Sequence, residues 1–349
     1  MAGVTEDEAA LYDRQIRLWG LEAQNKMRSA HVVVVCFSGV ATEVIKNIVL
    51  SGIGSLTIVD SELVRPDDLG AGFFFRDTDI SRKRIAEAPL ARVQALNPLV
   101  KVRGAEHSAV ASSDACKMLQ ADVLVACAGT RAELETLNTH CRAHNTMFYA
   151  TQAQGMGGFI FSDLGPHYTY ALELPMPGKQ EKQRFRYTQS FVTLHDSLRT
   201  TWSKSPREDE IVGQPVRRIS AGLWATWALW ELQSRKEPVL SVEDFATKLE
   251  TLATDLMRAK NVQVETLARQ VDMPHFFATF ARAMYTHVSE NSVAGFAPVT
   301  AVLGGLLAQD LLNALGHTQV PMVNWCILDA SSGTAPIHAI GTLPATKEA

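Results

Sequence analysis

A short turn at residues 36–41 has the position of a phosphate-binding loop but not its composition. The turn follows a valine-rich run, precedes a segment with helical periodicity, and is followed by a second β-rich run. In dinucleotide-binding folds, the glycines of a G-x-G-x-x-G turn let backbone N–H groups approach phosphates at a helix N-terminus. Only Gly39 falls on that pattern here, whereas Cys36 and Ala41 carry side chains where the backbone must come close.

Asp60 ends the second β-rich run, a position from which a carboxylate can accept hydrogen bonds from ribose hydroxyls. An acid at a strand end more often forms a turn or a cap, and this alternative stays open. Val40 adds a β-branched side chain beside the phosphate position. The sequence therefore indicates the outline of a nucleotide cradle whose chemistry is weakened.

Other glycine, aromatic and cysteine patterns favour structural roles. The glycine-dense segment 154–159 precedes a strand rather than a helix, which indicates an inter-strand turn. Tryptophans recur every third residue at Trp224, Trp227 and Trp230, a spacing typical of a helix face packed in a core. No G-x-S-x-G, H-E-x-x-H or Walker A pattern is present.

The cysteines indicate neither a metal site nor a disulfide framework. No two of them form a C-x-x-C pair, and they stand at 36, 116, 127, 141 and 326. Cys127 lies in a predicted buried strand and Cys141 in a predicted helix, so we interpret both as inert thiols in a reducing compartment.

The composition and net charge of the chain limit the classes of partner that we expect. The 349 residues carry a net charge of −4, which gives no indication of nucleic-acid or anionic-membrane binding. The N-terminal segment is acidic and polar, unlike a signal peptide. The apolar run 295–308 is too short to span a bilayer and predicts a buried helix.

Strands and helices alternate along most of the chain, which predicts a doubly wound α/β sheet. The predicted strands are 31–35, 55–60, 99–106, 121–129, 146–154, 157–164 and 324–330. The predicted helices are 21–30, 41–52, 79–97, 131–145, 220–235, 241–261 and 297–315, preceded by one that starts at the capping box of Thr5 and ends at Gly20. We expect one domain formed by 1–165 plus 291–349 and a partly helical insertion at 166–290.

The segment "YDRQIRLWGLEAQNKMRSAHVVVV" (12–35) resembles the start of the ubiquitin-like-protein activating enzymes. Their Rossmann-like adenylation fold is shared with bacterial MoeB and ThiF. "GGFIFSDLG" and "FAPVTAVLGGLLAQDLLNAL…NWCILDASSG" are also similar to that family. The resemblance covers roughly 8–165 and 291–342, and is strongest to the small, regulatory (Aos-type) subunits that serve the modifier SUMO.

Compared with the active members of this family, the nucleotide site looks degenerate. "DDLGAGFFF" stands where S-N-L-N-R-Q-F is expected, so Gly70 and Ala71 replace the phosphate-binding Asn and Arg. The lysine position falls on Arg84 in "SRKR", and in "ACAGTR" the magnesium-binding aspartate is Gly129. Together with the turn at Cys36, Gly39 and Ala41, these changes leave only Asp60 and Arg131 in place. The resemblance thus implies no cofactor in this chain.

The resemblance also implies a role for Arg14 and a set of partners. The arginine of the Y-D-R-Q element reaches into the ATP site of the partner subunit, which assigns that role to Arg14, with Arg17 as the weaker candidate. A surface ion pair with Glu8 or Asp13 is the alternative. The implied partner is a catalytic (Uba-type) subunit with ATP, magnesium, a structural zinc and the catalytic cysteine. It activates a SUMO-like modifier for a downstream conjugating enzyme, in the nucleus, with the cytoplasm as a second location.

Three other functions stay open at this point. The scaffold subunit of the NEDD8-activating enzyme has a longer middle insertion than this chain. A self-sufficient MoeB/ThiF-like homodimer needs the glycine turn and an acid at Gly129. A nicotinamide-dependent dehydrogenase needs the same turn and a catalytic His or Lys constellation, which is not evident.

Overall fold

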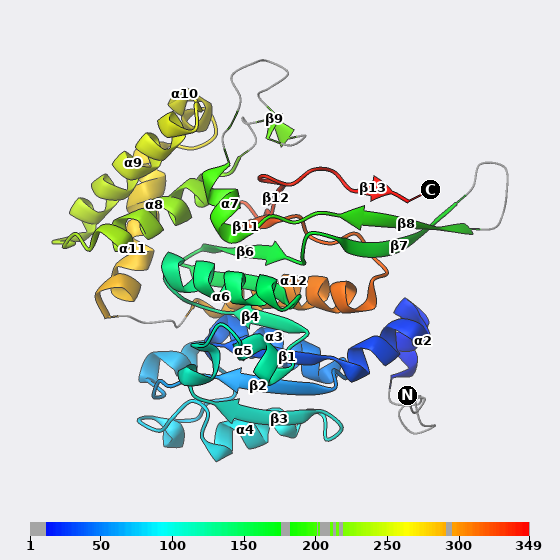
Figure 1. Cartoon of the computed structure of the whole chain (residues 1–349). Helices are drawn as coiled ribbons and strands as arrows, with labels where there is room; N and C mark the ends of the chain where they lie inside the picture. Colours follow the sequence, from blue (N-terminus) through cyan, green and yellow to red (C-terminus); the bar gives the residue numbers. More distant parts are fainter. Residues whose placement is uncertain are drawn as a thin grey trace.

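The protein is built around one twisted sheet covered by helices on both faces (Figure 1). The computed structural model describes residues 12–175, 182–200, 202, 210–211, 214–215, 219–290 and 295–348. The strand order is β12-β11-β6-β5-β4-β1-β2-β3. The strands of this sheet are β1 (His31–Val35), β2 (Ser55–Val59), β3 (Lys101–Ala105), β4 (Val123–Ala126), β5 (Met147–Gln154), β6 (Gly157–Asp163), β11 (Trp325–Asp329) and β12 (Ile337–His338).

Strands β3, β2, β1, β4 and β5 are parallel, and β6, β11 and β12 continue the sheet with antiparallel pairings. The chain moves from β1 outward to β2 and β3, then returns to place β4 on the other side of β1. The order therefore reverses between β1 and β4, which is where doubly wound folds bind ligands. The predicted doubly wound α/β fold is confirmed.

Helices cover each face of the sheet in a separate core. One face carries α2 (Asp13–Ser29), α3 (Gly39–Leu50), α4 (Glu87–Gln94) and α12 (Ala297–Gly316). The other face carries α5 (Ala115–Leu119), α6 (Arg131–Ala143), α7 (Leu194–Arg199) and α8 (Ala221–Arg235), with α9 (Val242–Ala259), α10 (Val264–Ala268) and α11 (Met273–Glu290) beyond α8. Short 3-10 turns occur at Pro66–Gly70, Asp77–Asp79 and His107–Val110.

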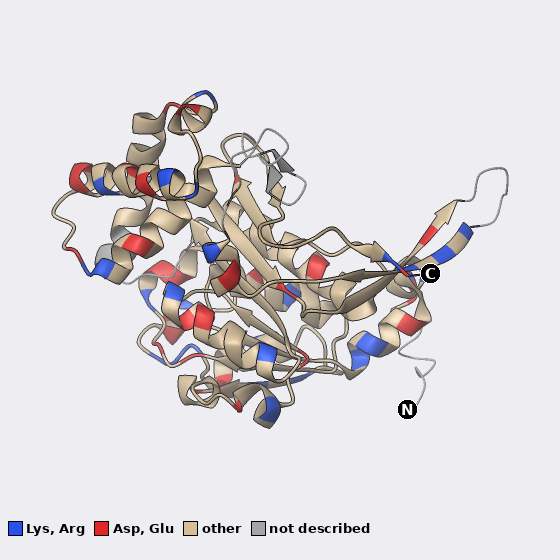
Figure 2. Cartoon of the chain, turned by 45° about the horizontal axis from the view of Figure 1, so that its top comes forward, with Lys and Arg blue, Asp and Glu red and all other residues tan. Residues whose placement is uncertain are grey.

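A three-stranded sheet of β7 (Tyr168–Pro175), β8 (Lys182–Gln189) and β13 (Thr346–Lys347) extends from the body next to α2. Figure 2 shows basic residues on both β8 and α2 at this end of the molecule. An exposed ion pair at 3.6 Å joins Arg184 of β8 to Glu22 of α2. The other short strands, β9 (Glu210–Ile211) and β10 (Gln214–Pro215), pair with each other.

Local sequence explains the elements that form the cradle. All five residues of β1 are buried and four are valines, which suits a central parallel strand. Ser38 caps α3, and Gly52 ends it with a φ of +80°. There, the Ile53 N–H donates to Ile48 O and the Gly52 N–H donates to Val49 O, which is a Schellman motif.

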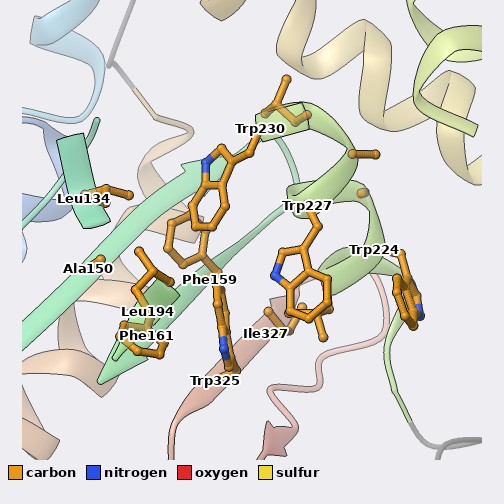
Figure 3. Close-up of a cluster of buried hydrophobic side chains, with 14 of the residues drawn as sticks. Leu134, Ala150, Phe159, Phe161, Leu194, Trp224, Trp227, Trp230, Trp325 and Ile327 are labelled. Atoms are coloured by element: carbon orange, nitrogen blue, oxygen red, sulfur yellow. The ribbon is translucent and has the colours of Figure 1, made fainter. Parts of the chain in front are cut away.

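Helix α8, which lies inside the predicted insertion, packs directly on the central sheet. Figure 3 shows Trp227 and Trp230 projecting toward Trp325 of β11 and Phe159 of β6, with Trp224 on the far side of Trp227, at 5.6 Å between ring centroids. Trp230 meets Phe159 edge-on at 5.2 Å between ring centroids, and Trp227 lies 5.9 Å from Trp325. The interpretation of these tryptophans as core residues is confirmed.

The helix predicted over 79–97 is wrong in its first half. Residues 80–86 form a loop, and α4 begins only at Glu87. In this loop Ser81 has a φ of +66°, and Lys83 forms an isolated antiparallel β-bridge with Leu63. The buried ion pairs of Arg84, described below, hold this loop against the turn at 36–41. The cap predicted at Thr5 lies outside the described residues, whereas Gly20 breaks α2 with a φ of +86°.

Helix α12 is long and apolar enough to cross a membrane by length and composition alone. It is the one such helix among the described residues, and two thirds of its apolar window is buried in the protein core. It packs against α3, α2 and the sheet, which confirms the buried helix predicted from the sequence.

Candidate functional site

The turn at 36–41 lies at the switch point between β1 and β4, as expected for a nucleotide cradle. Ser38 caps α3 there, since its Oγ accepts from the Ala41 N–H at 3.3 Å. The same hydroxyl donates to the carbonyl of Cys127, at the end of β4, at 3.1 Å. The strand–turn–helix geometry is therefore retained, while the helix N-terminus is capped from within the chain.

Aromatic side chains fill the space around this turn. Phe37 is fully buried, with Phe75 and Phe74 at ring-centroid distances of 4.9 and 6.0 Å. Burial and the nearby carboxylate of Asp60 raise the pKa of Cys36 to about 12, so its thiol stays protonated. Apolar packing has replaced the open backbone that a phosphate needs.

Asp60 is buried, and protein groups use both of its carboxylate oxygens. Its Oδ2 accepts from the Phe37 N–H at 2.7 Å, and its Oδ1 accepts from the Glu62 N–H at 2.7 Å. Arg84 Nη1 lies 3.5 Å from Oδ2. The acid that the sequence offered for ribose hydroxyls is thus committed to the turn and to an internal ion pair.

Arg84 sits in the middle of this filled cradle, with only 2% of its surface exposed. It bonds to Asp68 through Nε at 3.1 Å and Nη2 at 2.9 Å, a two-pronged contact. Burial opposes its charge, but Asp68 and Asp60 outweigh burial and raise the pKa of the guanidinium. Arg84 neutralises two buried carboxylates and is not free to neutralise a phosphate.

Gly39 and Ala71 are brought together, but by packing. A Cβ at Gly39 would lie 2.7 Å from Ala71 Cβ and 3.2 Å from Thr300 Cγ2, so only glycine fits under this loop. Gly70 is exposed beside them. The absence of a side chain at Gly39 thus lets the loop 66–71 pack directly on the start of α3.

The metal position lacks its aspartate, and the nearest carboxylate, Glu133, is used to cap α6: its Oε2 accepts from the Thr130 N–H at 2.7 Å and would lie 3.6 Å from a Cβ at Gly129. Gly129 has a φ of +147° in the loop between β4 and α6. Arg131, at the start of α6, pairs with Glu135 at 2.7 Å. No group of three or more His, Cys, Asp or Glu side chains that could hold a metal occurs in the described part of the chain. These residues do not fit a magnesium–nucleotide complex.

Arg14 lies at the other edge of the sheet, on the first turn of α2. It is exposed and makes no ion pair with any described residue, while Arg17 pairs with Asp13 at 3.0 Å. Of the two alternatives weighed for Arg14, the pair with Asp13 is wrong, and Glu8 lies outside the described residues. Arg14 is therefore the freer of the two candidate arginines.

Tyr12 anchors the helix that carries Arg14. Its side chain is 4% exposed, and its hydroxyl accepts from Asn97 Nδ2 at 2.8 Å. The same Nδ2 donates to the carbonyl of Val49 at 2.9 Å. A Cβ at Gly52 would lie 2.5 Å from the Tyr12 ring, so this glycine makes room for it.

Gly52 and Asn97 precede β2 and β3, at the amino ends of the parallel strands, whereas the cradle lies at their carboxyl ends. A five-residue strand separates these edges by roughly 17 Å. The start of α2, which carries Arg14, therefore lies at the edge of the sheet opposite the cradle of its own chain.

The outer sides of α3 and α12 carry exposed apolar side chains, Leu50 at the end of α3 and Val302 and Leu306 on α12, which are between 36% and 47% exposed. We call this surface the α3–α12 face. It also includes the ion pair of Glu43 and Lys46 on α3, and Lys46 lies 5.5 Å from the ring of Phe73 in the loop that follows Gly70. The two helices touch through Gly304, where a Cβ would lie 2.4 Å from Glu43 Cβ. Asp310 is the one charged residue in α12, and it is buried.

Sequence reasoning missed the residues that fill the cradle. Phe37, Phe74, Phe75 and Asp68 were not predicted to meet there. Two signals point to them: a phenylalanine inside a turn that needs small residues, and the run "DDLGAGFFF", which pairs acids with three aromatics.

The chain matches the ThiF family over residues 12–340. It is 29% identical to SUMO-activating enzyme subunit 1 of Danio rerio, over 96% of this chain and 95% of that protein. It is 28% identical to the Homo sapiens protein of that name, over 97% of each chain. DNA damage tolerance protein RHC31 of Saccharomyces cerevisiae is 27% identical over 96% of this chain and 97% of its own length. These matches confirm the resemblance seen in the sequence.

Proposed function

Because the chain belongs to the ThiF family, we propose that it is the non-catalytic but required subunit of a heterodimeric SUMO-activating enzyme. The full-length similarity to proteins named SUMO-activating enzyme subunit 1 supports the modifier and the subunit role. In this proposal, a larger partner of the same fold uses ATP to adenylate the modifier and then forms a thioester with it.

The observation that carries this proposal is the filled cradle. The Asp60 carboxylate is bonded to the Phe37 N–H and paired with Arg84, and no side chain at Gly129 can hold a metal. A site without its metal and cationic clamp cannot stabilise charge on departing pyrophosphate. The chain therefore keeps the adenylation fold for its surfaces, and alone it forms no acyl-adenylate.

The α3–α12 face is the surface that we assign to the partner. Related folds pair through equivalent surfaces about a pseudo-two-fold axis. Obligate interfaces are large and apolar, in keeping with exposed Val302 and Leu306 beside buried Leu303 and Leu307. The catalytic cysteine, the magnesium site and the structural zinc belong to the partner in this proposal.

Arg14 is the residue that we assign to chemistry in trans. Its position at the far edge of the sheet keeps it from its own cradle, and the Tyr12–Asn97 hydrogen bond fixes the start of its helix. A guanidinium meets two phosphate oxygens at once and stays charged at every relevant pH. Delivered across the interface, it offsets the negative charge that develops as pyrophosphate leaves.

Reconstitution tests the function. The partner, captured by affinity purification of this chain and expressed separately, is assayed for SUMO-dependent ATP–pyrophosphate exchange with and without this chain. We expect exchange only when both subunits are present, and none from this chain alone. Exchange by this chain alone, or with NEDD8 in place of SUMO, would overturn the proposal.

A further inference from the structure

Two buried thiols outside the cradle lie in contact. Cys116 Sγ in α5 and Cys141 Sγ in α6 are 3.5 Å apart, and both residues are at most 2% exposed. A disulfide requires an S–S distance of about 2.05 Å, so the sulfurs need to approach by roughly 1.5 Å. This is the one sulfur–sulfur contact found among the described cysteines, all five of which are free thiols.

A chain of hydrogen bonds holds the two cysteines in register. The Ala121 N–H donates to the Cys116 carbonyl at 3.0 Å, and Thr146 Oγ1 donates to the Ala121 carbonyl at 2.9 Å. The Thr146 N–H then donates to the Cys141 carbonyl at 3.0 Å. The backbones on both sides of the pair are therefore tied to each other before any bond forms between the sulfurs.

The two thiols differ in character. The hydrogen bond between the two thiols lowers the pKa of Cys116, despite burial. Burial, and the same hydrogen bond, raise the pKa of Cys141. Cys116 is thus the thiol of the pair that ionises more readily, and Cys141 is the neighbour that can resolve an oxidised Cys116.

Helix α5 offers a route for a small oxidant. It has five residues, of which Ala115 and Cys116 are the buried ones, and the side chain of its cap residue Asp114 makes no capping bond. The preceding residues 111–114 and Met118 are exposed. A short helix with so few buried contacts opens locally at low free energy.

We propose that Cys116 and Cys141 form a reversible disulfide when the protein meets a hydroperoxide. The Cys116 thiol releases its proton, and the thiolate attacks the hydroxyl oxygen of the hydroperoxide. An S–O bond forms, the O–O bond breaks, and the other oxygen leaves with the electron pair and takes up that proton, as an alcohol (water, for hydrogen peroxide). Cys141 then attacks the Cys116 sulfur, the S–O bond breaks, and the hydroxyl leaves as water with the Cys141 proton. The two sulfurs lose two electrons in total, which the O–O bond accepts.

Hydrogen peroxide is the probe. The full-length chain in its complex is treated with graded peroxide, denatured with N-ethylmaleimide and no reductant, and mapped by mass spectrometry. We expect a linked Cys116–Cys141 peptide pair, lighter by two hydrogens, that dithiothreitol reverses. Cys36, Cys127 and Cys326 should remain alkylated at the same peroxide concentration, because burial raises the pKa of each.

Variants separate the two roles. In Cys141→Ala, Cys116 should stop at a sulfenic acid that a 1,3-dicarbonyl reagent captures, whereas the matched control Cys326→Ala should keep the full cross-link. The wild-type map decides the question even if Cys141→Ala fails to fold. Unlinked, alkylated Cys116 and Cys141 at peroxide levels that oxidise the other cysteines, or Cys116 sulfinic acid without a cross-link, would overturn the proposal.

Discussion

The Phe37 N–H donates to Asp60 Oδ2 across 2.7 Å, so the turn and the strand end that would grip a nucleotide bind each other. Arg84 lies 3.5 Å from the same oxygen and also bonds to Asp68. Because these polar groups find all of these partners within the chain, the cradle keeps its shape without the glycines of a phosphate-binding loop. It is now part of the core, and its loss would leave buried polar groups without partners.

Arg84→Met should destabilise the protein strongly, because it leaves Asp60 and Asp68 buried without their cation. Removing one member of a buried ion pair costs about 3–5 kcal/mol, or roughly 5 °C in Tm for a chain of this size. Differential scanning calorimetry of the purified complex measures it. The matched control is Lys83→Met, whose exposed pair with Glu106 should barely matter. Equal Tm values for the two variants would show that the filled cradle does not stabilise the fold.

Arg14→Ala should leave the heterodimer assembled and slow adenylation of the modifier. Loss of one charged transition-state stabiliser costs on the order of 3 kcal/mol, a factor of a hundred or more. Arg14→Lys should recover only part of the rate, because a point charge lacks the two-pronged geometry. The assay is ATP–pyrophosphate exchange at matched subunit concentration, with Arg17→Ala as the control that changes little. An unchanged rate in Arg14→Ala would make Arg14 a surface residue.

Val302→Glu should block assembly, because it places an unpaired charge among the exposed apolar side chains of α12 on the α3–α12 face. We expect the dissociation constant of the heterodimer to rise at least about a hundredfold, measured by light scattering after size exclusion and by titration. Leu240→Glu is the control, since Leu240 is 78% exposed between α8 and α9, far from this face in sequence and fold. Assembly of the Val302 variant at wild-type affinity would place the interface elsewhere.

Asp310 should make stability depend on pH. Burial raises its pKa to about 6, against hydrogen bonds from Tyr149 and the Met322 N–H. The folded state therefore holds a proton that the unfolded state releases near pH 4, so this contribution is complete below pH 4 and is lost as pH rises through 6. The change is on the order of 3 kcal/mol.

Asp310→Asn tests this sign, since the amide stays neutral at every pH. The Tm of the variant minus that of the wild type should increase between pH 4 and pH 7. A difference that is flat, or that decreases across this range, would contradict the raised pKa.

Periodicity alone predicts most of the sheet and its covering helices. Val32–Val35 are buried and β-branched, and the end of the helix predicted over 41–52 coincides with the Schellman motif at Gly52, although α3 begins two residues earlier, at Gly39. The helix predicted through Arg84 fails for a tertiary reason. In the folded chain Arg84 forms ion pairs with the buried carboxylates of Asp60 and Asp68. A helical periodicity in the sequence contains no information about these pairs.

For the candidate site too, the positions of the residues could be predicted from the sequence, but their contacts could not. Gly39, Asp60 and Gly129 could be placed at the switch point from sequence, because their position follows from the strand ends. That Asp60 is bonded internally could not, because the N–H of Phe37 and the guanidinium of Arg84 reach it only in the folded chain. The anchoring of the start of α2, which carries Arg14, likewise could not be predicted, because Tyr12 and Asn97 form their hydrogen bond across 85 residues of sequence.

The number of nucleotide sites per heterodimer tests the central claim most directly. The reconstituted complex is titrated with magnesium–ATP at a protein concentration well above the dissociation constant, and the equivalence point is read by calorimetry. Two ThiF folds with one filled cradle predict one ATP per heterodimer, unchanged in Arg84→Met if that variant assembles. An equivalence point of two would contradict the account, because it would mean that the cradle around Asp60 and Arg84 opens to bind a nucleotide.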